Sequence, residues 1–327
     1  MGQVKRLGRK VERVGYSHGL SAVSRVVHAR HDLADTVSLI ASKRTGSTWV
    51  QELISGGPGV CPIFEPLQGD ARVNRLSRER EALITRDEEV PDLEAFLSRA
   101  MRGHHVTKLA MRLATPRQLL EADRFVVKHV QLSLAAGWLE RVFPTSPMVL
   151  LVRHPCAVTQ SMLTVRWSGS TVDEIFERRP AASNRAALEL LDGRTTPAEA
   201  FAALWCTEMI AMLGDTDPAR ASLLAYESVA DDPAGALGPV MEHLGLPRPP
   251  DLAARSTKPS ATTHKTSAVR SSGDLVSGWV DRLDVADRDA VLAVVRDAGI
   301  TGYGADPRPD LDALHAQHAR PPITAGT

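Results

Sequence analysis

The stretch of sequence that decides the fold is Thr36-Val-Ser-Leu-Ile-Ala41, followed by Ser42-Lys-Arg-Thr-Gly-Ser-Thr-Trp49 and Val50-Gln-Glu-Leu-Ile54. Its first part is an apolar run typical of a buried strand, Gly46 permits a tight turn, and Ser47 with Thr48 is a typical helix start. Such a turn directs backbone N–H groups and the positive end of the helix dipole at one point. The stretch therefore predicts a site for a phosphate-sized anion, to which Lys43 or Arg44 adds further donors.

Short apolar runs like the first one recur along the chain, separated by longer segments of helical character. They extend from Val106 to Met111, Phe125 to Val130, Met148 to Val152 and Ser222 to Tyr226. Continuous rather than alternating hydrophobicity favours strands that are buried on both faces of a parallel sheet. The sequence thus predicts an α/β fold: a central parallel sheet flanked by helices, with a P-loop-like strand-loop-helix phosphate site.

Three regions follow from composition. Residues 1–32 are predicted to form a basic N-terminal extension, residues 33–305 one domain, and residues 306–327 a flexible C-terminal tail. The extension is interpreted as solvated, although peripheral contact with an anionic membrane stays open. The densely charged stretch from Gly69 to about Arg102 fits a helical insertion over a pocket and an exposed helix pair equally well.

Bulk properties narrow the class of protein. The 327 residues include 39 basic and 39 acidic side chains, so no overall field favours nucleic acid. There is no run of about eighteen apolar residues and no apolar signal-peptide core, so no transmembrane segment is expected. The three cysteines have no metal-ligand spacing, which favours a reducing, cytoplasmic setting over a disulfide or zinc framework. The sequence does not indicate an oligomeric state.

A second phosphate motif follows the apolar run that ends at Val152. Arg153 stands at the predicted strand end, Pro155 is suited to open a helix, and Ser161 lies eight positions after the arginine. A guanidinium can hold a phosphate through its planar fork of donors, and the serine adds one more hydrogen bond. The two motifs together predict a ligand that carries two separate anionic groups.

The two motifs resemble those of sulfotransferases that use 3′-phosphoadenosine 5′-phosphosulfate (PAPS). Arg44-Thr-Gly-Ser-Thr-Trp49 is similar to the family's phosphosulfate loop, and Arg153-His-Pro…Ser161 to its 3′-phosphate motif. The loop is not a Walker A motif, because the basic residue precedes the glycine. His154 and Cys156 depart from the family's usual residues, and neither is an expected phosphate ligand.

The resemblance covers roughly Asp35 to Tyr303. Ile63-Phe-Glu-Pro-Leu67 is similar to a segment of carbohydrate sulfotransferases, and Phe125-Val-Val-Lys-His-Val130 to their lysine-bearing strand. Leu223-Leu-Ala-Tyr-Glu227 also resembles a family stretch. This likeness implies a hydroxyl acceptor of the carbohydrate type, which includes glycolipids and glycosylated metabolites, or another small molecule.

With PAPS as the donor, the predicted positions of individual residues indicate their roles. Arg44 is expected to stabilise the leaving phosphate, Glu65 to act as general base and Lys128 to contact the transferred group. His129 is expected to be structural, and His154 is a reserve base. No metal is expected. The expected nucleotide-binding residues are Lys43, Arg44, Thr45, Gly46, Ser47, Thr48, Trp49, Arg153, Ser161 and, in a late basic loop, Lys265, Ser267 and Arg270.

Two other functions stay open at this point. A P-loop-type small-molecule kinase would need a lysine after the last loop glycine and an acidic metal-holding residue at a strand end, and this sequence has Ser47 and Arg153 instead. A non-catalytic nucleotide-binding protein would keep the same binding residues. Loss of activity in Glu65→Gln with retained nucleotide binding would favour an enzyme over that second alternative.

Overall fold

The computed structural model describes Val27 and residues 30–68, 82–104, 109–165, 171–177, 181–262 and 274–319. Within these residues, five parallel strands form one sheet in the order β2-β3-β1-β4-β5. The strands are β1 (Thr36–Ala41), β2 (Val60–Ile63), β3 (Arg124–His129), β4 (Met148–Val152) and β5 (Ala221–Ala225). The predicted α/β fold with a central parallel sheet is confirmed.

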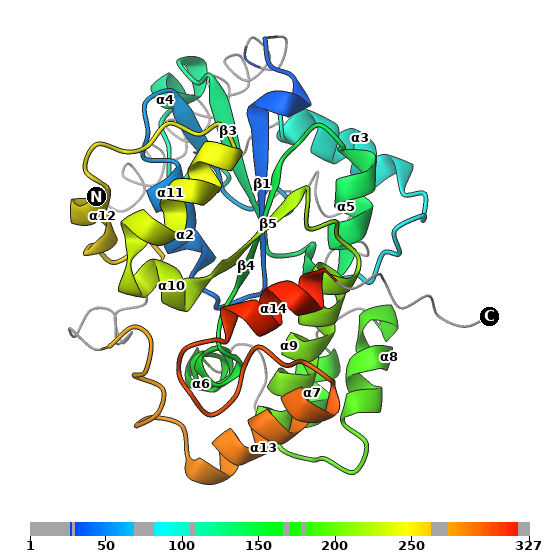
Figure 1. The fold of residues 1–327 in the computed structure, drawn as a ribbon. Coiled ribbons are helices and arrows are strands. Elements are labelled where there is room, and N and C mark those ends of the chain that lie inside the picture. The colour runs from blue at the N-terminus through cyan, green and yellow to red at the C-terminus, as the bar shows by residue number, and fades with distance from the viewer. Residues whose placement is uncertain are drawn as a thin grey trace, which may run out of the picture.

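Helices connect and cover the strands (Figure 1). They are α2 (Ser47–Ile54), α3 (Pro91–Ala100), α4 (Pro116–Leu120), α5 (Ala136–Val142), α6 (Pro155–Val165), α7 (Val172–Glu177), α8 (Ala181–Leu190), α9 (Pro197–Gly214), α10 (Tyr226–Asp231), α11 (Pro233–His243), α12 (Leu252–Ser256), α13 (Val285–Asp297) and α14 (Leu311–His318), with the 3-10 turns η1 (Leu33–Asp35) and η3 (Ser133–Ala135).

One predicted strand is wrong over its described part, and its residues 106–108 lie outside the described residues. In the apolar run from Val106 to Met111, the described residues 109–111 form turns. The second strand is instead β2, which contains Pro62 and lies at the edge of the sheet. Proline lacks the N–H that an inner strand must donate, so it is tolerated at an edge.

The alternating side chains of the strands supply two separate hydrophobic cores. Leu39, Val126 and Val149 pack on the side of α2, α10 and α11, whereas Ile40 and Leu150 pack on the side of α5 and α9. Figure 1 shows these helices on opposite sides of the strands. Buried residues on both faces explain why the strand sequences are apolar throughout rather than alternating.

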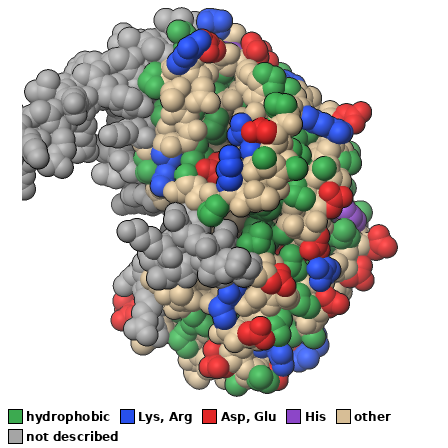
Figure 2. Space-filling view, turned by 90° about the vertical axis from the view of Figure 1, so that its left-hand side faces the viewer, with side chains coloured by type: hydrophobic (Ala, Val, Ile, Leu, Met, Phe, Trp, Pro, Cys, Tyr) green, Lys and Arg blue, Asp and Glu red, His purple; other side chains and the backbone are tan. Residues whose placement is uncertain are grey.

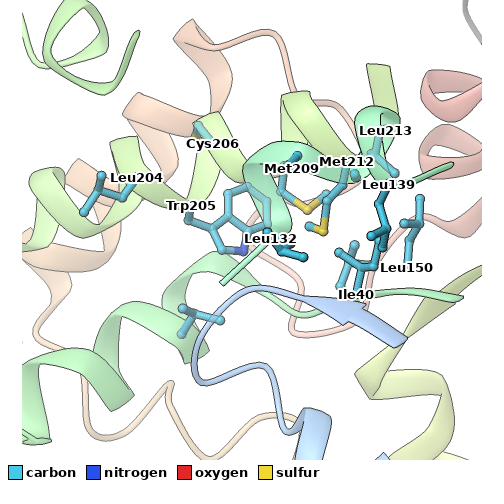
Figure 3. Close-up of a cluster of buried hydrophobic side chains, with 14 of the residues drawn as sticks. Ile40, Leu132, Leu139, Leu150, Leu204, Trp205, Cys206, Met209, Met212 and Leu213 are labelled. Carbon is cyan, nitrogen blue, oxygen red and sulfur yellow. The ribbon is translucent and has the colours of Figure 1, made fainter. Parts of the chain in front are cut away.

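Helix α9 is the centre of the second core. Its Trp205, Met209 and Met212 belong to the same cluster as Ile40 and Leu150, and Figure 3 shows Trp205 beside Leu132. Its apolar residues lie all around the helix, as expected for a helix enclosed by others. Across the described ranges, no helix combines the length and the apolar character that crossing a membrane requires.

The sequence singles out three peripheral segments: the N-terminal extension, the charged stretch and the C-terminal tail. Nearly all of the basic N-terminal extension lies outside the described residues. Helix α3 falls within the charged stretch from Gly69 to Arg102, and residues 69–81 of that stretch are outside the described ranges. Within the C-terminal tail, residues 311–318 form α14, whose Leu314 and His318 are buried. The domain boundaries stay a prediction.

Candidate active site

The loop after β1 takes the tight turn that the sequence predicts. Gly46 has φ +82° and precedes the first residue of α2, and Thr45 Oγ1 donates a hydrogen bond of 2.8 Å to the carbonyl of Ser42. A Cβ at Gly46 would lie 2.4 Å from Tyr226 Cε2, so only glycine fits between the turn and that ring. The first N–H groups of α2 are thus gathered at the carboxyl end of β1.

The two predicted phosphate motifs meet at one place. They follow β1 and β4, which are neighbouring parallel strands, and the carboxyl ends of such strands lie at the same edge of the sheet. Arg44 Nε donates a hydrogen bond of 2.9 Å to Ser161 Oγ, and Arg153 Nη1 donates one of 3.2 Å to the carbonyl of Arg44. Residues 117 positions apart in sequence therefore line one site.

This place has a marked excess of positive charge. Burial, and secondarily the neighbouring charge of Arg153, holds the pKa of Arg44 below its ordinary value. The guanidinium of Arg153 lies 4.1 Å from the ring centroid of Tyr226, and its buried Nε has no hydrogen-bond partner among the described residues. Neither arginine forms a salt bridge with a described carboxylate. Two crowded guanidinium groups with unused donors suit a phosphate ligand.

Lys128 and Glu65 form a buried ion pair beside the first loop. Lys128 Nζ lies 2.7 Å from Glu65 Oε1 and donates a hydrogen bond of 2.8 Å to Thr48 Oγ1. The lysine side chain is only 2% exposed. Burial lowers the pKa of Lys128, and the charge of Glu65 counteracts that effect. An ammonium in such surroundings requires an anionic partner, and Glu65 supplies one.

The carboxylate of Glu65 is held from both sides. Gln131 Nε2 donates a hydrogen bond of 3.1 Å to Glu65 Oε2, opposite the contact with Lys128. The backbone of Glu65 has φ +34°, a conformation that non-glycine residues rarely adopt. Sequence reasoning missed Gln131, because one glutamine directly after a predicted strand matches no pattern.

The two histidines of the central motifs are not available to a substrate. His129 lies on the sheet face opposite to Lys128 and is 1% exposed, as the strand alternation predicts. The reserve base His154 is fully buried and stacked on Trp279. Its Nδ1 accepts from the Cys156 N–H and its Nε2 lies 3.0 Å from the carbonyl of Gly304, so both ring nitrogens are engaged. The reserve role for His154 is therefore wrong.

His154 instead belongs to a network that supports Arg153. Its backbone N–H donates a hydrogen bond of 2.8 Å to Glu227 Oε1, and Tyr303 Oη lies 3.4 Å from the other oxygen of that carboxylate. Trp205 Nε1 donates to the carbonyl of Arg153 at 3.1 Å. These contacts fix the end of β4, which holds the guanidinium of Arg153 in place.

Some of the remaining expected site residues lie at the start of α2, and others fall outside the described residues. Ser47, Thr48 and Trp49 are buried at the start of α2, and the rings of Trp49 and Tyr226 are 5.4 Å apart. Lys43 is half-buried. Three expected nucleotide-binding residues lie outside the described residues: Lys265, Ser267 and Arg270. The described parts of the chain contain no cluster of histidine, cysteine, aspartate or glutamate side chains arranged to hold a metal. The three cysteines are free and buried.

Comparisons with known proteins give one family. A model described as the sulfotransferase family matches residues 37–250. Similar solved structures include the sulfotransferase domain from the curacin biosynthetic pathway, with 17% identity over 83% of this chain and 99% of that chain and a TM-score of 0.46. Another is a mouse sulfotransferase, SULT7A1, complexed with PAP, with 11% identity over 93% of this chain and 95% of that chain and a TM-score of 0.47. No curated protein matches this chain.

Proposed function

Because this chain belongs to the sulfotransferase family, we propose that it transfers the sulfuryl group of PAPS to a hydroxyl of a carbohydrate-type acceptor. The observation that carries the proposal is the meeting of two arginine-bearing loops at one end of the sheet, where Arg153 bonds to the backbone of Arg44. PAPS carries two phosphate groups at separate positions, and two adjacent basic sites suit such a ligand.

The residues present fit this co-substrate. The start of α2, with Gly46, Ser47 and Thr48, offers backbone and hydroxyl donors for the phosphosulfate end. Arg153 and Ser161 would hold the 3′-phosphate, because Arg153 has an unpartnered buried Nε and crowds another guanidinium. Bound PAPS supplies the activated sulfuryl group. Arg44, between the two sites, would neutralise the negative charge left on the departing phosphate.

The ion pair of Glu65 and Lys128 would handle the acceptor. Glu65 takes the proton of the acceptor hydroxyl, a bond forms between that oxygen and sulfur, and the bond from sulfur to the phosphate oxygen breaks. Lys128 can donate hydrogen bonds to the transferred group while it keeps Glu65 oriented. Gln131 holds the second carboxylate oxygen, so that the base cannot rotate away from the acceptor.

Nucleotide selectivity tests the donor half of the proposal. In a thermal-shift titration, 3′-phosphoadenosine 5′-phosphate (PAP) should raise the melting temperature more than AMP or ATP with magnesium, because only PAP offers a 3′-phosphate to Arg153. The Arg153→Ala variant should lose this preference and respond to PAP and AMP alike. A larger response to ATP with magnesium would contradict the proposal and favour a kinase.

Replacing Glu65 tests the catalytic half. Glu65→Gln keeps the side-chain size and removes the base, so sulfuryl transfer measured with labelled PAPS should fall by roughly 100-fold or more. Binding of PAP should change little, since the side chain of Glu65 contacts Lys128 and Gln131 and not the two arginines proposed to hold the nucleotide. An unchanged rate of sulfuryl transfer would show that Glu65 is not the general base. Any selective PAP binding would then rest on the two arginine loops alone.

A further inference from the structure

A second cation lies at the edge of the Glu65 and Lys128 pair. Arg112 places its guanidinium carbon 4.9 Å from the ring centroid of Phe64, and Lys128 Nζ lies 3.9 Å from the same centroid. Phe64 immediately precedes Glu65 in the chain. The ring of Phe64 therefore contacts both Arg112 and Lys128 beside the proposed acceptor site.

The segment that carries Arg112 is anchored to the loop of the proposed base. The N–H of Phe64 donates a hydrogen bond of 2.7 Å to the carbonyl of Ala110, two residues before Arg112. The guanidinium is also restrained by its contact with the ring of Phe64. The position of Arg112 relative to Glu65 is therefore set by two independent contacts.

The two cations differ in what balances their charge. Lys128 is 2% exposed and is paired with Glu65, whereas Arg112 is exposed and forms no salt bridge with a described residue. Glu52 is half-buried nearby, and burial raises its pKa although the fields of Lys128 and Arg112 act in the opposite direction. Arg112 is thus close enough to influence the site electrostatically, and its side chain is accessible to a ligand.

We propose that Arg112 selects an acceptor that carries its own anionic group, such as a carboxylate, next to the hydroxyl that is sulfated. The inference rests on the proposed function, since it assigns the acceptor side of the same site. A carboxylate would receive hydrogen bonds from the planar guanidinium, as in other arginine pairs. Lys128 is not suited to this purpose, because two donors of its buried ammonium are bonded to Glu65 and Thr48 and the third is assigned above to the transferred group.

A matched pair of sugars tests the proposal. p-Nitrophenyl β-D-glucuronide and p-nitrophenyl β-D-glucoside share ring and aglycone and differ in a carboxylate at one carbon. With PAP bound to the full chain, the glucuronide should bind roughly 3- to 10-fold more tightly in calorimetric titration, the effect expected of one partly exposed charge pair. With PAPS, kcat/KM should show the same preference.

Three variants assign the preference to one residue. Arg112→Gln should abolish it, and Arg112→Lys should retain part of it because the charge remains. Arg117→Gln is the control: it removes a charge that is also exposed, five positions on in α4, where Arg117 is paired with Glu121. Because α4 leads into the amino end of β3, Arg117 lies away from the carboxyl ends that hold the site, and the preference should persist.

The possible outcomes separate this inference from the proposed function. If PAP binds selectively but the wild-type protein does not prefer the glucuronide, or if Arg112→Gln keeps the preference, the role of Arg112 is wrong and the donor site stands. If PAP itself does not bind, the proposed function fails first, and the inference falls with it.

Discussion

At the scale of single residues, two backbone conformations are unusual. Arg44 has φ +67° and Glu65 has φ +34°, and no other non-glycine residue in the described ranges has a positive φ. For an L-residue the left-handed region costs about 1 kcal/mol or more, because Cβ approaches the carbonyl oxygen. Both residues belong to the proposed site. Such strain persists where the side chain matters more than the local backbone energy.

Replacing Arg44 by glycine or alanine should separate strain from function. Both variants lose the guanidinium and its bond to Ser161, but only glycine adopts φ +67° without cost. Arg44→Gly should therefore be more stable than Arg44→Ala by about 1 kcal/mol in urea unfolding. Sulfuryl transfer should be strongly reduced in both.

The reverse order is expected inside a helix. At Glu94, an exposed position within α3, the alanine variant should be more stable than the glycine variant by about 1 kcal/mol. If alanine were also the more stable residue at position 44, the left-handed conformation of Arg44 would impose no strain. The cost of about 1 kcal/mol that we assign to this conformation would then be wrong.

At the scale of elements, hydrophobic periodicity and turn residues in the sequence predicted most strands and the turn into α2 correctly. The apolar runs identified β1, β3, β4 and β5, and Gly46 identified the turn into α2. β2 escaped because it has only four residues and contains Pro62, which argues against an inner strand. The pattern around residues 106–111 suited a strand, yet no strand partner uses residues 109–111. Burial alone does not fix secondary structure.

The sequence predicted the candidate site residues that lie in motifs and missed those that only the fold brings beside them. Arg44, Arg153 and Ser161 stand in two motifs, and their contact follows from the neighbouring strands β1 and β4. Gln131 and Arg112 became visible only through contacts with Glu65 and Phe64. No local signal marks an isolated polar residue as a neighbour of a distant carboxylate.

The junction of β1 and α2 gives a prediction that compares two glycines. Gly46→Ala requires a left-handed alanine and places Cβ 2.4 Å from Tyr226 Cε2, whereas Gly193 has φ +72° with no atom within 4 Å of such a Cβ. Gly193→Ala should cost about 1 kcal/mol from the backbone alone. Gly46→Ala should cost more, roughly 2 to 4 kcal/mol, because the ring must also move.

Two further measurements show whether Tyr226 causes the excess. In the Tyr226→Ala background, the cost of Gly46→Ala in urea unfolding should fall toward that of Gly193→Ala. PAP should no longer raise the melting temperature of Gly46→Ala, since the shifted turn misdirects the N–H groups of α2. Equal costs for the two glycine variants would mean that the turn yields easily and that the ring does not constrain it.

At the scale of the whole molecule, charge is distributed without a dominant sign. On the face in Figure 2, basic, acidic and hydrophobic side chains lie interspersed among the described residues. The balance of 39 basic and 39 acidic residues agrees with this picture. Two arginine side chains, Arg44 and Arg153, nevertheless lie close together at the proposed site, so we expect recognition of an anion to be local.

The interior also contains titratable groups that link folding to pH. Burial lowers the pKa of His129 to about 3 and that of His154 to about 4, from an ordinary value of 6.5. Both are therefore neutral in the folded protein at pH 5, while the unfolded chain binds protons at these positions below pH 6.5. Stability must then decrease as the pH falls from about 6.5 toward 4, by roughly 2 kcal/mol per histidine at pH 5.

His129 provides the sharpest test of this coupling. Its two ring nitrogens are buried without a hydrogen-bond partner among the described residues. Leucine is similar in size to histidine, so His129→Leu removes these unsatisfied polar atoms without leaving a large cavity. His129→Leu should be at least as stable as the wild type in urea unfolding at pH 7.5. At pH 5 the difference in free energy of unfolding between His129→Leu and the wild type should be about 2 kcal/mol larger than at pH 7.5, because the unfolded variant does not bind a proton at this position. If both proteins lost equal stability between these pH values, His129 would have to be protonated in the folded state as readily as in the unfolded one, which its burial in an apolar core opposes.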